Sequence, residues 1–337
     1  MNQVTGLNKS DKPVGDLEGS VKFDRPLMLT PAENFTGYVL NAGAQSLIFI
    51  ITCTAVAAVL LIFSYIFTKA MPFFEEIGLW EALKEMFGSA KWYPADDHDP
   101  IFGMLSIIFG TLYVTTIAIV IAVPVSLAVA VFLSDIVPFS VRQVVKPIVE
   151  LLAAIPSVTF GFFAVLIVKP WMQDSLGVTA GDNALNCGII LAFMAMPTIV
   201  SVAEDSLSSA GRGIREGSYA LGATRFEMLF GVTIPAAKSG IIAAIILGIM
   251  RAVGETMLVL MACGTAAKIP EPIWNLTSQI HTITAAICAE LGETPEGSVH
   301  RSALFVMALL LLVFTLILNT ISGYFLSRNK KATGGSA

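Results

Sequence analysis

Six long apolar stretches constrain the fold of this chain more than any other feature of its sequence. An α-helix needs about 20 consecutive apolar residues to cross the hydrocarbon layer of a membrane. Only 13% of the residues are charged, whereas about a quarter of an average soluble domain is charged. We therefore predict an all-α integral membrane protein with six transmembrane helices, at about 45–68, 104–133, 147–169, 186–204, 239–263 and 303–327.

The polar segments between these stretches predict how the chain is divided. We expect a disordered tail at 1–44, the first transmembrane helix and a loop at 45–103, and the other five helices at 104–327. A second short tail follows at 328–337. Because the first stretch follows a long segment of mixed charge, we interpret it as a retained membrane anchor rather than a cleaved signal peptide.

Lysine and arginine predict the orientation of the helices, because they are more frequent in cytoplasmic loops than in outer ones. If the N-terminus is cytoplasmic, the inner segments hold 13 of the 20 basic residues, the outer segments hold six, and Arg251 is the remaining one. We therefore predict that both termini are cytoplasmic and that 70–103 and 265–302 form the two large outer segments.

Two opposite charges stand near the middle of the fifth stretch, GIIAAIILGIMRAVGETMLVLMACG, at 240–264. A charged side chain at the bilayer centre costs about 2.5–3.5 kcal/mol on insertion scales, so ionisable residues there are functional by default. Arg251 and Glu255 are four residues apart, which places them on one face of a continuous helix. A pair with a purely structural or gating role is the alternative, although buried ion pairs rarely stabilise more than apolar residues do.

Small residues recur every four positions in the same stretch and form a smooth stripe beside the charged face. Such a stripe lets another helix approach closely. It consists of Gly240, Ala244, Gly248 and Ala252. Prolines within or near three other stretches predict kinks or hinges, at Pro124, Pro156 and Pro197.

The predicted inner loop at 205–238 has a pattern of its own, with short amphipathic helices expected at 214–220 and 224–230. Gly222 lies between them, where a glycine permits the left-handed backbone of a tight joint. Pro235 suits the first turn of the fifth transmembrane helix. This pattern fits either a hairpin on the lipid surface or a docking element for another protein.

Acidic residues also lie at the predicted inner ends of the helices. Asp135 follows the second stretch, and Glu204 and Asp205 follow the fourth. The sequence leaves open whether these carboxylates meet a partner protein or water.

The spacing in the inner loop resembles the EAA loop of ABC importer permeases. Glu-Gly-Ser is followed by three intervening residues and a glycine, and then by nine further residues and Val-Thr-Ile-Pro. Glycine and serine replace the two alanines of the motif, and the glycine lowers helix propensity by up to about 1 kcal/mol. The resemblance implies docking on a cytoplasmic ATPase through Glu216, Gly217, Ser218, Gly222, Ile234 and Pro235.

Three further stretches resemble the C-type permease of the high-affinity phosphate (Pst) ABC importer. They are 107–138, 149–165 with ELLAAIPS, and 250–257 with MRAVGETM. The resemblance covers about 90–327 and implies the type I ABC importer permease fold in a bacterial inner membrane. It also implies inorganic phosphate as substrate, and as partners a second homologous permease, two ATPase subunits and an extracytoplasmic phosphate-binding protein.

The resemblance gives the buried charges a role. We expect Arg251 to line the path between the two permeases and to offset the charge of phosphate, because arginine is always ionised and presents a planar fork to an oxyanion. Glu255 would pair with Arg251 in an empty path and compete with the anion in an occupied one. That competition would keep binding weak enough for release.

Chemistry on the chain itself is not expected. The sequence lacks the phosphate-binding motif GxxxxGK[ST], because the nearest candidate, at 237–239, has no glycine before the lysine. Its cysteines and histidines have no spacing typical of a metal site. We therefore predict a transport subunit that is not an enzyme, without a metal or cofactor, whose ATP is used by a partner. Open alternatives are an A-type phosphate permease, a permease for phosphonate, molybdate or sulfate, and a secondary anion transporter.

Overall fold

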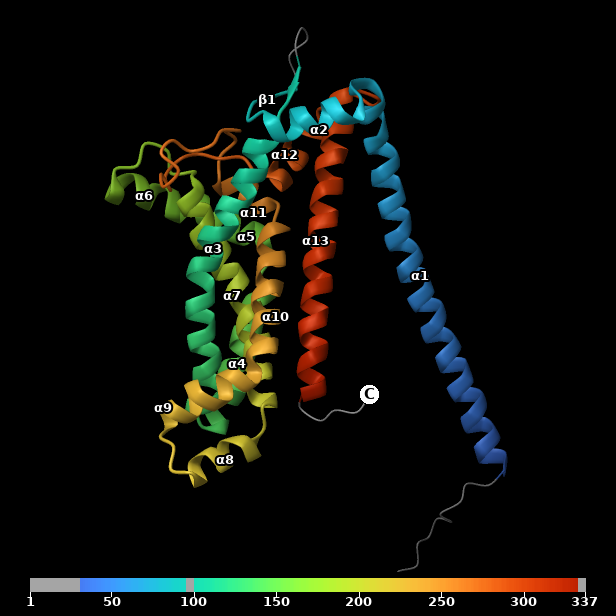
Figure 1. Ribbon diagram of the computed structural model, residues 1–337, viewed down its shortest axis with the longest axis vertical. Helices are drawn as coiled ribbons and strands as arrows, with labels where there is room; N and C mark the ends of the chain where they lie inside the picture. Colours follow the sequence, from blue (N-terminus) through green and yellow to red (C-terminus); the bar gives the residue numbers. More distant parts are fainter. Residues whose placement is uncertain (1–30, 95–99, 333–337) are drawn as a thin grey trace, which may run out of the picture. The chain divides into compact units, whose positions relative to one another are not determined.

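The computed structural model describes residues 31–94 and 100–332 (Figure 1). The chain divides into two compact units, Met1–Leu61 and Ile62–Ala337. Within the described residues, five helices are long and apolar enough to cross a membrane, and a bent pair of helices gives a sixth candidate. The prediction of an all-α chain with six candidate membrane segments is therefore confirmed.

The first helix, α1 (Pro31–Ile77), is longer than expected. Residues 31–44 are helical, so the disordered tail that the sequence predicts is wrong for them, and the rest of that predicted tail lies outside the described residues. The part of α1 that is apolar enough to cross a membrane spans Asn41–Ile77.

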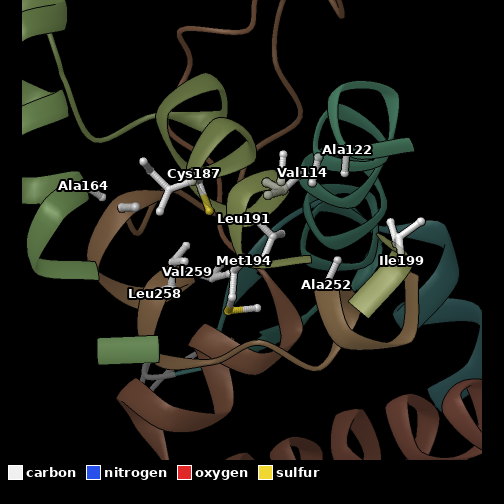
Figure 2. Packing of buried hydrophobic residues seen from close by; sticks show 14 of the residues in the cluster. Val114, Ala122, Ala164, Cys187, Leu191, Met194, Ile199, Ala252, Leu258 and Val259 are labelled. Atoms are coloured by element: carbon white, nitrogen blue, oxygen red, sulfur yellow. The ribbon is translucent and has the colours of Figure 1, made fainter. Parts of the chain in front are cut away.

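Three helices form the centre of the second unit. They are α3 (Leu105–Val131), α7 (Ala184–Ser209) and α10 (Ile234–Val253). The middle helix, α7, packs against both of the others, and Figure 2 shows side chains from all three meeting in the apolar core. The helices α3 and α7 confirm the predicted second and fourth helices. The predicted sixth helix is confirmed as α13 (Val299–Ala332).

A second apolar cluster closes one end of this unit. It joins the last turns of α1 to α2 (Leu79–Gly88), α12 (Ile283–Glu290), α13 and the antiparallel pair β1 (Trp92–Tyr93) and β2 (Ile101–Phe102). We call this end the α12 end and the opposite one, which carries α8 and α9, the α8 end (Figure 1). Fully buried side chains here include Phe73, Met104 and Leu304.

The predicted third transmembrane helix is not continuous. Instead, α4 (Phe139–Ala153) is followed by a helical segment, Ser157–Leu176, at an angle of 83°. That segment comprises α5 (Ser157–Phe163), the π-helix η2 (Ala164–Val168) and α6 (Lys169–Leu176). Pro156 explains the break, because it lacks an N–H and disfavours helical backbone at the residue before it. The single helix predicted at 147–169 is therefore wrong.

The predicted fifth helix is wrong at both ends. It begins with α9 (Arg225–Met228) and the π-helix η3 (Leu229–Thr233), which run directly into α10. Its last residue is Val253, and the apolar sequence continues only as the short α11 (Met257–Ala262). Hydrophobicity did not reveal this break, because the residues on both sides of it are apolar.

The expected helices of the inner loop are present in outline. The first is α8 (Arg212–Ala220), and Gly222 has a φ of 84°, which confirms the predicted left-handed joint. Thr224 and Glu227 form a capping box at the start of α9. Pro235 is the second residue of α10, but it does not begin the helix, because η3 continues the helix upstream of it. Proline has no backbone N–H to donate to an upstream carbonyl, and the wider turns of a π-helix lie directly before it.

The small-residue stripe of α10 lies inside the bundle. All four of its residues are buried: Gly240, Ala244, Gly248 and Ala252. A Cβ atom built on Gly248 would lie 2.5 Å from Cγ1 of Ile199 in α7. Glycine is therefore required for α7 and α10 to approach this closely.

The substitution Gly248→Leu should destabilise the protein by about 1–3 kcal/mol, because overpacking a filled core displaces side chains and backbone. Thermal unfolding of the detergent-solubilised protein measures this. A matched control is Gly323→Leu in α13, where a Cβ atom would meet nothing within 4 Å. Equal stability of the two variants would contradict the close packing of α7 and α10.

Candidate functional site

Arg251 lies in the last turn of α10, at a junction of three elements. Its Nη1 donates to Oγ1 of Thr198 in α7, and its Nη2 donates to the carbonyl oxygen of Ala153, the last residue of α4, both at 3.3 Å. Its Nε is buried and has no hydrogen-bond partner among the residues that the structure describes. The guanidinium is thus held by two long hydrogen bonds and keeps donors that a ligand could use.

Two helix breaks meet at this arginine. One follows α4 at Ala153 and the other follows α10 at Val253. Ala154, Pro156 and Gly254, which lie within the breaks, are exposed on this chain. In a membrane, unwound backbone is tolerated only where protein covers it or where it lines a water-filled cavity. The surface around Arg251 therefore requires either a second chain or a water-filled path.

Glu255 occupies a different position from the one predicted. The helix ends before it, so it does not share a helix face with Arg251, and among the described residues no ion pair joins the two side chains. The predicted pairing within one helix is therefore wrong for this structure. The carboxylate accepts a long hydrogen bond, 3.4 Å, from the backbone N–H of Leu258 instead.

The backbone of Glu255 is fixed by α12. Its carbonyl oxygen accepts a hydrogen bond of 2.7 Å from Oγ1 of Thr284. Glu255 also lines a small cavity whose polar wall is formed by hydroxyls of α3 and of the chain around the start of α12: Thr111, Thr115, Thr282 and Thr284. Hydroxyls both donate and accept hydrogen bonds, so the cavity offers polar partners inside an apolar bundle.

The residues of the EAA-like loop lie at the α8 end. Glu216, Gly217 and Gly222 are exposed, whereas Ser218 is buried. Ile234 and Pro235 belong to the start of α10. Large apolar side chains beside them are also exposed, including Leu221 at 91% and Phe226 at 69%. An exposed apolar patch with a polar rim is typical of a protein-binding or membrane-binding surface.

The acidic residues at the helix ends form ion pairs within the chain. Glu204 of α7 is 1% exposed and accepts hydrogen bonds from Arg142 and Lys146 of α4. Lys146 also pairs with Asp205 at 2.6 Å. Asp135, in the π-helix η1 (Phe132–Ile136), pairs with Arg215 of α8. These carboxylates stabilise contacts between helices of this chain rather than meeting a partner or water alone.

A polar cluster at the α12 end was not predicted. The carboxylate of Glu290 accepts hydrogen bonds from Nε1 of Trp92 at 3.0 and 3.1 Å and lies 2.7 Å from Nε2 of His300. Nε2 of the buried His281 lies 3.8 Å away. Burial raises the pKa of Glu290, but the nearby His281 and the hydrogen bonds with His300 and Trp92 outweigh it and lower the pKa to about 2. The cluster thus joins β1, α12 and α13 around one ionised carboxylate.

The profile of a known family matches residues 126–331, more than half of the chain. Its description is "Binding-protein-dependent transport system inner membrane component". The chain belongs to this family. It is an ABC importer permease, and the proteins that it matches are transport subunits rather than enzymes.

Three curated relatives cover most of this permease. It is 37% identical over 246 residues to the "Probable ABC transporter permease protein YqgH" of Bacillus subtilis (strain 168), which covers 73% of this chain and 78% of the relative. It is 32% identical to the "Phosphate transport system permease protein PstC" of Mesorhizobium japonicum, over 76% and 84% of the two chains. The PstC protein of Haemophilus influenzae is 30% identical, over 77% and 87%.

The fold is also similar to a solved structure. The chain matches one described as "Inward facing conformations of the MetNI methionine ABC transporter: CY5 SeMet soak crystal form" with a TM-score of 0.50 and 18% identity. The match covers 66% of this permease and 93% of the other chain. The predicted type I ABC importer permease fold is therefore confirmed.

Several residues of the site were beyond the reach of the sequence. Thr198 and the carbonyl of Ala153 contact Arg251 from helices 53 and 98 residues away, and no local pattern indicates such partners. Pro156, where the sequence predicts a kink or hinge, does lie at the break after α4, because proline interrupts helical hydrogen bonding. Gly254 was a weaker signal for the break after α10, since glycines are frequent in membrane helices.

The substitution Glu290→Gln should lower the free energy of unfolding by about 1–2 kcal/mol at pH 7, less than the full equivalent of the pKa shift because solvent screens this half-buried group. A carboxylate whose pKa is lowered by folding contributes stability above its unfolded pKa and loses that contribution as the pH falls through the folded pKa. The difference should therefore shrink below about pH 4.5 and vanish towards pH 2.

Thermal unfolding of both proteins in detergent across this pH range measures the difference. Glu293→Gln is the matched control. Glu293 is exposed, lines the same cavity as Glu290, and has no side-chain hydrogen bond among the described residues. A destabilisation by Glu290→Gln that stays constant down to pH 2 would show that the ionisation of Glu290 is not its cause.

Proposed function

We propose that this permease carries inorganic phosphate into the cytoplasm as the C-type subunit of a high-affinity phosphate importer. The observation that carries the proposal is the position of Arg251, a cation with unused donors where two helix breaks meet. The PstC relatives, at 30% and 32% identity over most of the chain, support phosphate as the substrate.

The geometry of Arg251 suits reversible binding of an anion. Its two hydrogen bonds are 3.3 Å long, whereas hydrogen bonds between an ionised donor and an anionic oxygen are about 2.7–2.9 Å long and roughly twice as strong as neutral ones. An entering phosphate can therefore replace the contacts to Thr198 and Ala153 at little cost. The same contacts reform when the anion leaves, which supports transport rather than storage.

Glu255 is the second path residue of the proposal. It lies within the helix break that follows Arg251 and is half-buried beside the threonine-lined cavity. A carboxylate near the path repels phosphate, and this repulsion keeps the anion from being held too tightly. Glu255 acts in this proposal through its charge and not through an ion pair with Arg251.

The proposed assembly places a partner on each of three surfaces of this chain. A second homologous permease covers the exposed helix breaks, and two ATPase subunits bind at the α8 end, where Leu221 and Phe226 are exposed beside Glu216. An extracytoplasmic phosphate-binding protein docks at the α12 end.

This permease itself holds no cofactor; ATP is used by the ATPase subunits. Both termini are cytoplasmic, and the complex lies in the inner membrane of a bacterium.

Arg251→Gln should reduce uptake of labelled phosphate at micromolar concentration at least about tenfold. The reason is that a hydrogen bond to a charged group is worth about 1.5–3 kcal/mol, and about 1.4 kcal/mol corresponds to a factor of ten. The measurement uses cells without their own high-affinity phosphate permease that co-express this chain with its partners. Arg251→Lys should give intermediate uptake, because it keeps the charge but loses the planar fork.

Lys238→Gln is the matched control, since it removes an exposed cation of the same helix that has no hydrogen bond or ion pair among the described residues. Normal uptake by Arg251→Gln, at equal membrane levels, would contradict the path role of this arginine. A wild type that carries sulfate, molybdate or phosphonate but no phosphate would contradict the substrate and leave the importer intact.

A further inference from the structure

One arginine of α8 is fixed to two neighbouring elements by five hydrogen bonds. The guanidinium of Arg215 donates to both carboxylate oxygens of Asp135, with Nε 2.6 Å from Oδ1. It also donates to Oγ of Ser134 at 3.2 Å and to the carbonyl oxygens of Leu207 at 2.8 Å and Gly211 at 3.3 Å. Arg215 therefore binds the end of α3, through η1, and the end of α7 at the same time.

This ion pair is largely removed from solvent. The side chain of Asp135 is 6% exposed and that of Arg215 is 16% exposed. Separating such a pair leaves two poorly hydrated charges, which costs far more than separating a surface pair. A displacement of α8 is therefore transmitted to the end of α3 more easily than the pair is broken.

The backbone of α8 alone does not provide this rigidity. Gly211 and Gly222 flank the helix with φ values of 88° and 84°. Such joints consist of residues without a Cβ atom, and glycine has the widest conformational freedom. The side chain of Arg215 therefore connects α8 to residues on the other side of the joint at Gly211 and to η1.

The other end of the connection lies at the candidate site. The helix that begins as α3 runs without a break from Leu105 to Ile136, including η1. Near its start, Thr111 and Thr115 line the cavity beside Glu255. One continuous helix therefore joins the Arg215–Asp135 pair to the wall of that cavity.

We propose that the Arg215–Asp135 ion pair is a positioning contact that couples movement of α8 to α3, and so couples ATP hydrolysis to transport. The inference rests on the proposed function, in which the ATPase subunits bind at the α8 end. Arg215 and Asp135 contact neither phosphate nor ATP in this proposal. Their effect is on the ratio of anions transported to ATP hydrolysed.

The experiment compares the complete importer, reconstituted in liposomes, with variants of this chain. ATP hydrolysis and uptake of labelled phosphate are measured in the same vesicles. Arg215→Gln and Asp135→Asn should each lower the ratio of phosphate transported to ATP hydrolysed by about fivefold or more, the lower range of typical coupling energies. The exchanged pair, Arg215→Asp with Asp135→Arg, should recover part of the loss. Asp174→Asn should leave the ratio unchanged, because Asp174 is an exposed carboxylate of α6 whose side chain has no hydrogen bond or ion pair among the described residues.

Arg215→Lys keeps the test decisive if the neutral variants fail to assemble. It retains the charge but not the fork that reaches Asp135, Ser134 and Leu207 together, so an intermediate ratio is expected. The proposal would be overturned if Arg215→Lys and every neutral variant that assembles had the same ratio as the wild type. It would also be overturned if the exchanged pair transported no more phosphate per ATP than the single variants.

The wild-type importer separates this inference from the proposed substrate. If it moves another oxyanion but not phosphate, the substrate is wrong, and the coupling ratio is measured with the oxyanion that it does carry. The ion pair is judged only by the difference between the variants and the wild type.

Discussion

The backbone at the two helix breaks is the constraint on which the rest of this permease depends. A membrane offers no water to satisfy unwound N–H and C=O groups, so each break needs partners from the protein. Arg251 donates to the carbonyl of Ala153 at the end of α4, and Thr284 donates to the carbonyl of Glu255 after α10. The same groups that stabilise the breaks thus place a cation and a polar cavity within the apolar bundle.

The charges of this chain are arranged in three layers. At the α8 end, Glu204 binds Arg142 and Lys146, and Asp135 binds Arg215, so α4, α7, α3 and α8 are joined by ion pairs. At the α12 end, hydrogen bonds around the carboxylate of Glu290 join β1, α12 and α13. Between them lies the apolar core around α7, and the half-buried Arg251 lies beside it at the helix breaks.

The ion pairs of the α8 end and Arg251 differ in how completely the chain satisfies their hydrogen bonds. The ion pairs of the α8 end are satisfied within the chain, and each joins helices that are far apart in sequence. Arg251 is different, because its hydrogen bonds are long and its Nε has no partner within 31–94 and 100–332. A cation that the fold leaves incompletely satisfied is the group best suited to bind a passing anion.

The sequence by itself determined which segments are apolar, and hence the membrane class and the second, fourth and sixth helices, because hydrophobicity is a local property. It also determined the left-handed joint at Gly222, because backbone freedom is local too. It also marked Arg251 by the cost of its charge. Only the tertiary structure decided that α10 ends at Val253 and that Arg251 contacts Thr198 and Ala153 rather than Glu255. Such partners come from distant segments, and their hydrogen bonds, not local hydrophobicity, determine where a membrane helix can end.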